Sequence, residues 1–317
     1  MIAWEFGAAD LAGLRFAHSP MAEVVASAFA LGQDNPWVPP AWRSRVAAAV
    51  EAWPVFSAVV LGPHGYAPDF LTPVPRTSRP TLAEELALIA ATPPDQVVEQ
   101  VLAGWEGRTQ PPEISDFARD PQAAVEALTD ELRQYFSFAI APLWAGLRAA
   151  ADAEIATRAR AAAEHSPRSL LDGLHPKLRW DGAALQIRYP HKHGRWSLDG
   201  HDLTLLPTGF AGGEVYAMPD APTGRALWYA PSGFGNVWAP ATKAALSALL
   251  GPTRAAVLTL LAAPGSTGEV AGRLGLAPAT ASHHLTTLRD AGLVAAERAG
   301  RRLIYQRTRL GDELVSR

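Results

Sequence analysis

Apolar residues recur at helical spacing through most of the first 170 residues. Ser19-Pro20 supplies a cap and a favoured first helical position ahead of an apolar stretch. Thr81-Leu82-Ala83-Glu84 has the form of a capping box and predicts the start of another helix. Asp120 opens a long helical region to about residue 164, broken near Pro142 because proline removes a backbone donor. We therefore expect the first 170 residues to be helical, with Asp10 capping a short helix near the start.

The hydrophobic period shortens after residue 178. Short segments rich in aromatic and branched residues lie between glycine-containing breaks, at 185–189, 203–206, 214–218 and 226–229. Strands separated by tight turns predict a small antiparallel β-meander over 178–230. The expected fold class is α+β and mostly helical, with a first domain at 1–240 and a second at 241–317.

The second domain has the pattern of a helix-turn-helix. Ser266 and Glu269 form a second capping box, and the helix that it opens can end at Gly275. A further helix begins at Pro278 and ends at Gly292. Two helices joined by a short turn containing glycine are typical of this motif.

The second helix of the motif has one narrow apolar stripe, formed by Ala281, Leu285 and Leu288 at positions i, i+4 and i+7. At about 100° per residue, His283 points away from the stripe and His284 lies nearer its edge. Further hydrogen-bonding side chains flank His283: Thr280, Ser282, Thr286 and Thr287. Short or planar polar groups suit contact with base edges in a groove, although a merely solvated helix face would have a similar composition.

A strand pair follows this helix, at 293–297 and 303–306, with a turn at Ala299-Gly300. The hairpin carries four arginines, Arg298, Arg301, Arg302 and Arg307. A hairpin beside a helix-turn-helix makes a winged helix, whose guanidinium groups can reach phosphate or the minor groove. The residues predicted to contact DNA are Thr280, Ser282, His283, His284, Thr286, Thr287, Arg298, Arg301 and Arg302.

Charge is distributed unevenly along the 317 residues. From residue 251 onward nine arginines face five acidic residues, a surplus of +4, so that the formal charge of −3 leaves −7 for residues 1–250. A basic end attracts a polyanion. The longest near-apolar run, 136–147, is too short to cross a bilayer, and the first residues lack an export signal. We expect a cytoplasmic protein that associates with the nucleoid and has no membrane partner.

The segments 274–285 (Leu-Gly-Leu-Ala-Pro-Ala-Thr-Ala-Ser-His-His-Leu) and 288–294 (Leu-Arg-Asp-Ala-Gly-Leu-Val) resemble the recognition segment of ArsR-type winged-helix transcriptional regulators. The resemblance covers residues 242–317. It implies a homodimer that binds double-stranded DNA at an operator with dyad symmetry and usually represses. Base-contacting positions of the family match Thr280, Ser282, His283 and His284.

The sequence departs from this family's metal sensors. The chain has no cysteine, so the helix before the turn holds no thiolate, and no histidine follows the hairpin. We therefore expect no metal site and no cofactor. Ala277 stands where a capping serine is usual, which should cost about 0.5–2 kcal/mol of helix stability. The last helix, 310–317, is short, so dimerisation is expected to rely on 242–250 and on the first domain.

Segments of the first domain, at 10–20, 68–73 and 203–207, are similar to an uncharacterised domain that precedes such winged helices in GC-rich bacteria. A dimeric winged helix does not need so large a domain to hold DNA, so we expect this domain to sense an effector or to set the dimer geometry. Aromatic residues either pack its core or line a small-molecule pocket: Trp196, Phe210, Tyr216, Trp228 and Tyr229. His191 and His193 fit a polar turn better than a metal site, because no third ligand is evident.

These features predict a sequence-specific transcription regulator, a dimeric repressor modulated by a non-metal effector or a partner. An activator or a ligand-independent regulator would show the same sequence features. A small-molecule enzyme that carries a DNA-binding tail is the rival class. The sequence shows no nucleophile elbow, phosphate loop or acid–base pair, and we therefore expect no enzymatic activity.

Overall fold

The chain divides into two compact units, Met1–Trp238 and Ala239–Arg317, in the computed structural model. The structure describes residues 1–7, 10–32, 38–63, 65–188, 193–198, 200–218, 224–232, 234, 243–299 and 302–315. The sequence-based boundary lies at 240–241. No helix within these described ranges combines the length and the apolar character needed to cross a bilayer.

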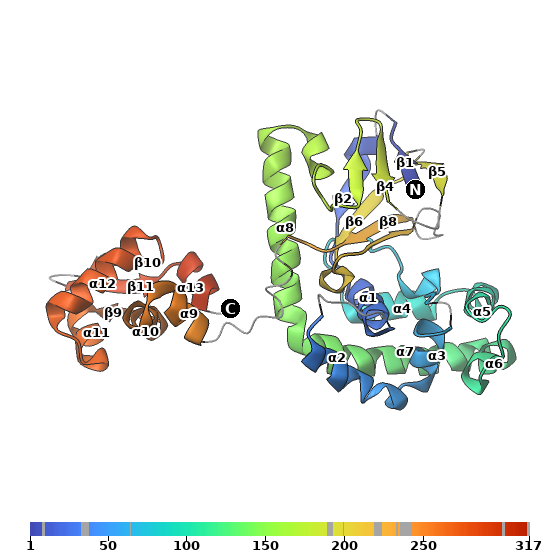
Figure 1. The fold of residues 1–317 in the computed structure, drawn as a ribbon, viewed down its shortest axis with the longest axis horizontal. Coiled ribbons are helices and arrows are strands. Elements are labelled where there is room, and N and C mark those ends of the chain that lie inside the picture. Colours follow the sequence, from blue (N-terminus) through green and yellow to red (C-terminus); the bar gives the residue numbers. More distant parts are fainter. Residues whose placement is uncertain are drawn as a thin grey trace. The chain divides into compact units, whose positions relative to one another are not determined.

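The first unit is mostly helical (Figure 1), as expected. Most of its helices begin on a proline, whose missing N–H costs nothing at a first helical position. The predicted capping box at Thr81 and Glu84 is present and starts α4. The α-helices are α1 (Pro20–Gly32), α2 (Pro40–Ala47), α3 (Pro54–Val60), α4 (Leu82–Ala90), α5 (Pro94–Ala103), α6 (Pro112–Arg119), α7 (Pro121–Tyr135) and α8 (Trp144–Glu164).

The predicted break near Pro142 separates α7 from α8. The π-helix η4 (Phe136–Ile140) follows α7, and the 3-10 helix η5 (Ala141–Leu143) follows η4. Asp120 accepts a hydrogen bond from Ala123 N at 3.1 Å and caps the start of α7. The long helical region is therefore two helices joined by a turn of altered winding, because proline cannot donate to the regular ladder.

Two four-stranded sheets complete the first unit, in the orders β3-β4-β1-β5 and β2-β6-β8-β7. Their pairs β1–β5, β2–β6 and β6–β8 are parallel, whereas β1–β4, β3–β4 and β7–β8 are antiparallel. The strands are β1 (Ile2–Glu5), β2 (Leu14–Phe16), β3 (Leu178–Trp180), β4 (Ala184–Ile187), β5 (Gly194–Ser197), β6 (Leu203–Pro207), β7 (Val215–Met218) and β8 (Arg225–Tyr229).

The predicted antiparallel meander is wrong in its pairing. Strands form near all four predicted segments, but they are divided between the two sheets, and β1 and β2 from the start of the chain join them. Asp10 opens the 3-10 helix η1 (Asp10–Gly13) between β1 and β2, so the opening residues are not wholly helical. A parallel pair needs a crossover connection, and the segment with β7 provides it between β6 and β8.

Two hydrophobic cores show how the layers pack. Ala226 and Trp228 of β8 pack in the core formed with the helices, whereas Leu227 and Tyr229 pack in a core shared with the other sheet. The sheet that contains β8 therefore lies between the helices and the second sheet. Burial on both faces explains why every residue of β6 is buried, since such a strand needs no polar alternation.

The second unit is a winged helix with its own core. Its short strand β9 pairs with β11, which pairs in turn with β10, and all pairing is antiparallel. Its elements are α9 (Lys243–Leu250), α10 (Pro252–Leu260), β9 (Gly265–Ser266), α11 (Thr267–Leu274), α12 (Pro278–Asp290), β10 (Val294–Ala299), β11 (Arg302–Arg307) and α13 (Arg309–Val315). The expected fold class, α+β and mostly helical with a C-terminal helix-turn-helix, is confirmed.

Candidate nucleic-acid interface

The turn between α11 and α12 is set by backbone chemistry. Gly275 adopts the left-handed conformation (φ 63°, ψ 32°), which lets the chain leave α11 without steric cost. At the other end of α11, Ser266 N donates to Glu269 Oε2 at 2.7 Å and the Ser266 hydroxyl oxygen accepts from Glu269 N at 3.4 Å, as the predicted capping box requires. This turn holds α12 against α10 and α11.

The apolar stripe of α12 is buried as predicted. Ala281 and Leu285 have no exposed surface and Leu288 is 1% exposed, because these residues pack into the core of the second unit. Away from this stripe, the polar side chains are accessible to different degrees. Thr280, Ser282 and His283 are exposed, and His284, Thr286 and Thr287 are partly buried. All six predicted contact residues of α12 therefore reach the surface.

The two histidines of α12 differ in environment. His283 is exposed, whereas Nδ1 of His284 is buried without a hydrogen-bond partner among the described residues. Burial lowers the pKa of His284, and the nearby charges of His283 and Arg254 lower it further. The His284 ring is therefore neutral near pH 7, so that it can accept as well as donate a hydrogen bond.

Thr287 is partly committed to its own helix. Its Oγ1 donates to the backbone oxygen of His283 at 2.9 Å, a common arrangement for threonine inside a helix. The hydroxyl proton is then unavailable to a ligand, although the oxygen can still accept. Among the side chains of this face, Thr280, Ser282 and His283 are the freest to donate.

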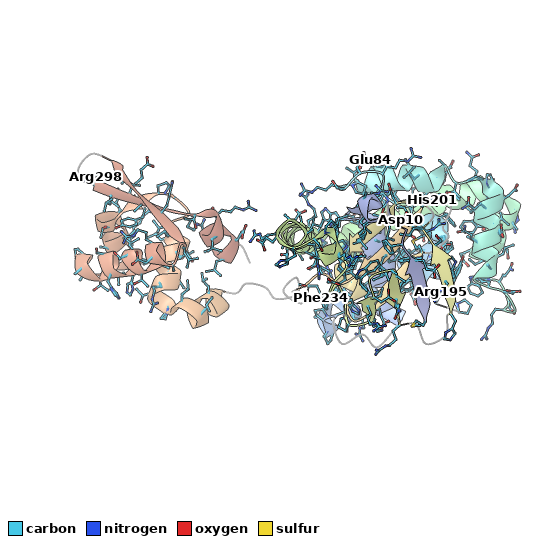
Figure 2. The ribbon with its side chains drawn as sticks, turned by 90° about the horizontal axis from the view of Figure 1, so that it is seen from above. Asp10, Glu84, Arg195, His201, Phe234 and Arg298 are labelled. Atoms are coloured by element: carbon cyan, nitrogen blue, oxygen red, sulfur yellow. The ribbon has the colours of Figure 1, made fainter. Side chains whose placement is uncertain are left out.

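Arginines lie on both strands of the hairpin. Arg298 near the end of β10 and Arg302 at the start of β11 are exposed, and Figure 2 shows Arg298 beside the hairpin tip. The register pairs Ala299 with Arg302, which places both arginines close to the turn. The predicted contact residue Arg301 lies outside the described residues.

The arginines of this unit differ in pairing. Arg289, Arg307 and Arg309 form ion pairs at 2.9 Å with Asp290, Asp312 and Glu313 respectively. Arg254, Arg298 and Arg302 form no ion pair within the part of the chain that the structure describes. Arg302 and Arg273 still act on Glu269, whose pKa is lowered mainly by its hydrogen bonds from Ser266. Arg273 of α11 likewise forms no ion pair within these residues, so the unpaired positive charge lies on the hairpin, α10 and α11.

Arg254 was missed by sequence reasoning. It lies on α10, a helix whose pattern indicates only scaffold packing, yet its charge reaches His284 on α12. The only signal in the sequence was its basic character. Its closeness to α12 depends on how α10 crosses the motif, which spacing along the chain does not give.

The predicted aromatic ligand residues are not brought together around one site. Phe210 and Trp228 are buried in the core next to the helices, and Tyr216 packs against that core. Tyr229 and Trp196 belong to the core between the two sheets. These five side chains are therefore divided between two cores, where their burial is accounted for by packing.

The described residues contain no group of three or more histidine, aspartate or glutamate side chains that could hold a metal ion. His191 lies outside the described residues. His193 Nδ1 lies 2.8 Å from the nitrogen of Met1.

Comparison with known proteins agrees with this geometry. Residues 249–296 match a family model described as a helix-turn-helix domain. The second unit is a helix-turn-helix domain. No curated protein and no solved structure matches the chain. The matched range runs from the end of α9 into β10 and includes all of α12, so that the domain indicates a DNA-binding transcription regulator.

Proposed function

We propose that the protein is a homodimeric transcription regulator of the ArsR type that recognises an operator with dyad symmetry. The observation that carries this proposal is the exposed polar face of α12, where Thr280, Ser282 and His283 stand away from the buried stripe. The unpaired arginines Arg298 and Arg302 on the hairpin support it. The family resemblance of residues 274–294 gives the type of regulator.

In this proposal α12 enters the major groove. Hydroxyl groups and a planar imidazole can hydrogen-bond to base edges there. His283 is the best candidate, because its side chain is long, exposed and available for hydrogen bonding. The guanidinium groups of Arg298 and Arg302 contact phosphate or the adjacent minor groove, which fixes the position of the helix without reading sequence. Arg254 adds a phosphate contact from α10.

Dimerisation is supported by apolar side chains on the outer helices of the second unit. Leu249 of α9 is 68% exposed and Leu310 of α13 is 54% exposed. α9 packs on the core of the unit through Leu246 and Leu250, so Leu249 faces away from that core. A second copy of the chain would cover these residues, and two copies would present two α12 helices to a symmetric operator.

The proposed sign of regulation is repression by occupation of a promoter. An effector or a protein partner bound to the first unit would change the spacing of the two α12 helices and release the operator. An activator or a ligand-independent regulator remains the alternative within regulation. A reporter gene behind the operator separates these, because a repressor lowers expression and an activator raises it.

Capture of genomic DNA fragments on the full chain tests the proposal. We expect the recovered fragments to share an inverted repeat with half-sites about one helical turn, roughly 10 base pairs, apart. The variant Ser282→Ala with His283→Ala is the matched control and should recover no shared sequence. Fragments without a common sequence from the native chain would contradict the proposal.

A further inference from the structure

The first unit contains a cavity of about 270 Å³. None of the five aromatic residues predicted to bind a ligand lines it. It lies where the start of α1, the segment before α4, the π-helix η4 and α8 meet, and its chemistry comes from His18, Arg79, Phe136, Trp144, Arg148 and Asp152. A cavity of this size takes a small ligand.

His18 is the most firmly held polar group in this cavity. The residue is 4% exposed, and its ring stacks on Trp144 with 4.6 Å between ring centroids. Nε2 lies 3.2 Å from Glu23 Oε1, and the Glu23 carboxylate also accepts from the N–H groups of Gly209 and Phe210 at 2.8 and 3.1 Å. These contacts fix the ring, while Nδ1 has no hydrogen-bond partner among the described residues.

Nδ1 is the ring nitrogen of His18 that Glu23 leaves available to a ligand in the cavity. Where Nε2 carries the hydrogen it donates to Glu23, and a doubly protonated ring has a second N–H on Nδ1. An anionic group in the cavity would accept that second hydrogen bond. The Glu23 charge is already directed at His18 and at two backbone donors, and does not oppose an anion on the other side of the ring.

The rim of the cavity carries positive charge. Arg79 is paired with Asp152 at 2.9 Å, but Arg148 is exposed and forms no ion pair within the described residues. Arg148 and Trp144 lie one helical turn apart on α8 and therefore on one face of it. The cavity thus offers one unpaired guanidinium next to an aromatic wall.

The apolar wall of the cavity is formed by two aromatic rings. The ring of Phe136 meets that of Trp144 edge-on, at a centroid distance of 5.4 Å. Phe136 belongs to a π-helix, a rare winding that often occurs at functional sites. Aromatic walls with a few convergent polar groups are typical of small-molecule sites.

We propose that this cavity binds a small carboxylate with a flat apolar body, the effector that the proposed function invokes. The carboxylate lies between Arg148 and His18, and the apolar body packs against Phe136 and Trp144. The effector role rests on the proposed regulator function, whereas binding itself does not.

α8 connects the cavity to the end of the first unit. Two turns beyond Arg148, the buried carboxylate of Glu154 accepts a hydrogen bond from Ser232 N at 3.1 Å. Ser232 follows β8 in the segment that leads to the second unit. A ligand that contacts Arg148 and Trp144 thereby contacts α8, the same helix that holds the end of the first unit through Glu154 and Ser232.

Calorimetric titration of the full chain without DNA tests the site. The probes are benzoate and indole-3-acetate, their neutral amides, and inorganic phosphate. We expect at least one of the two carboxylates to bind one site per chain with a Kd below about 1 mM, and its amide to bind at least about tenfold more weakly. Phosphate should not bind, because it lacks the apolar body.

Arg148→Gln changes an exposed side chain and should weaken carboxylate binding at least about tenfold. Arg160→Gln, an exposed arginine on the same helix outside the cavity, is the matched control and should leave binding unchanged. The proposal is overturned if neither carboxylate binds, if Arg148→Gln binds as tightly as the native chain, or if phosphate binds as tightly as a carboxylate.

The same probes added to a captured operator duplex separate this site from the proposed function. If the chain selects no DNA sequence, the proposed regulator function is wrong. Calorimetry still tests whether the cavity binds a carboxylate. Carboxylate binding that leaves operator affinity unchanged would remove the effector role and keep the site.

Discussion

At the residue scale, the adjacent side chains His283 and His284 on α12 differ in exposure and in how far their properties could be predicted. The exposure of His283 could be predicted, because helical periodicity alone sets which side of a helix a residue occupies. The neutral state of His284 could not, since it depends on burial and on Arg254 from another helix. The same holds for His18, whose importance appears only when Glu23 and Trp144 are brought to its two sides.

Replacing His283 with alanine should mainly reduce sequence preference. The lost contact to a base edge should reduce discrimination between operator and scrambled duplex by about fivefold or more, while non-specific affinity stays nearly constant. Titrations of both duplexes measure this ratio. His165→Ala, an exposed histidine of the first unit, is the control. An unchanged ratio for His283→Ala would exclude its role.

The hairpin arginines should behave differently. Arg298→Ala with Arg302→Ala should weaken binding to every duplex and lower the slope of log affinity against log salt by about one for each lost phosphate contact. Arg309→Ala removes an exposed arginine that is already paired with Glu313 and should change the slope little. Equal slopes for the native and doubly substituted chains would place the DNA elsewhere.

Glu85 gives the first unit a pH-dependent stability. Burial raises the pKa of Glu85 from its usual value near 4.5 to about 7, although hydrogen bonds from Ser19 and Met21 oppose the shift. Between these pH values the folded chain holds more protons than the unfolded chain, so the free energy of unfolding falls as pH rises. At pH 8 the cost reaches about 3 kcal/mol.

Glu85→Gln should remove this cost. We expect the variant to be more stable than the native chain at pH 8, with the difference shrinking toward pH 4.5. Denaturant titration followed by tryptophan fluorescence measures it, because all ten tryptophans precede the second unit. Glu99→Gln on the exposed surface of α5 is the control. A native-like pH dependence in Glu85→Gln would contradict the assignment.

At the element scale, local signals and long-range pairing differ in how well they could be predicted. The capping boxes at Thr81 and Ser266 could be identified from sequence because each acts within four residues. The sheets could not, because β1 pairs with β4 and β5 more than 175 residues away and its four residues show no alternation. A strand buried on both faces, such as β6, gives no clue to its partners.

The start of α12 lacks a stabilising side-chain cap. Ala277 occupies the N-cap with extended backbone angles and makes no side-chain capping bond. Ala277→Ser should supply an acceptor for the free N–H groups and stabilise the helix by about 0.5–2 kcal/mol. Amide hydrogen exchange of residues 278–290 should slow, and Ala295→Ser on β10 should leave it unchanged. Faster exchange in Ala277→Ser would mean that α12 begins elsewhere.

At the scale of the whole molecule, the uneven charge along the sequence could be counted in advance, but its pairing could not. Ion pairs neutralise Arg289, Arg307 and Arg309, so the unpaired arginines among the described residues of this unit are those of the hairpin, α10 and α11. The two-unit organisation follows from two separate types of core, one shared by sheets and helices and one within the winged helix.

Dimerisation belongs to this scale. Leu249→Asp with Leu310→Asp should convert the dimer to a monomer, because a charge cannot be buried at a contact without a partner. Sedimentation velocity measures the change in mass. Leu303→Asp, an exposed leucine of the hairpin, should leave the dimer intact. A native chain that sediments as a monomer would remove the symmetric operator from the proposal.

The most direct measurement is the reactivity of His283 toward diethylpyrocarbonate with and without a captured duplex. The exposed ring should be modified rapidly in the free chain, and several-fold more slowly when α12 occupies the groove, while His165 reacts at the same rate in both samples. Equal rates for His283 in the free chain and in the saturated complex would contradict the claim that this face of α12 binds DNA.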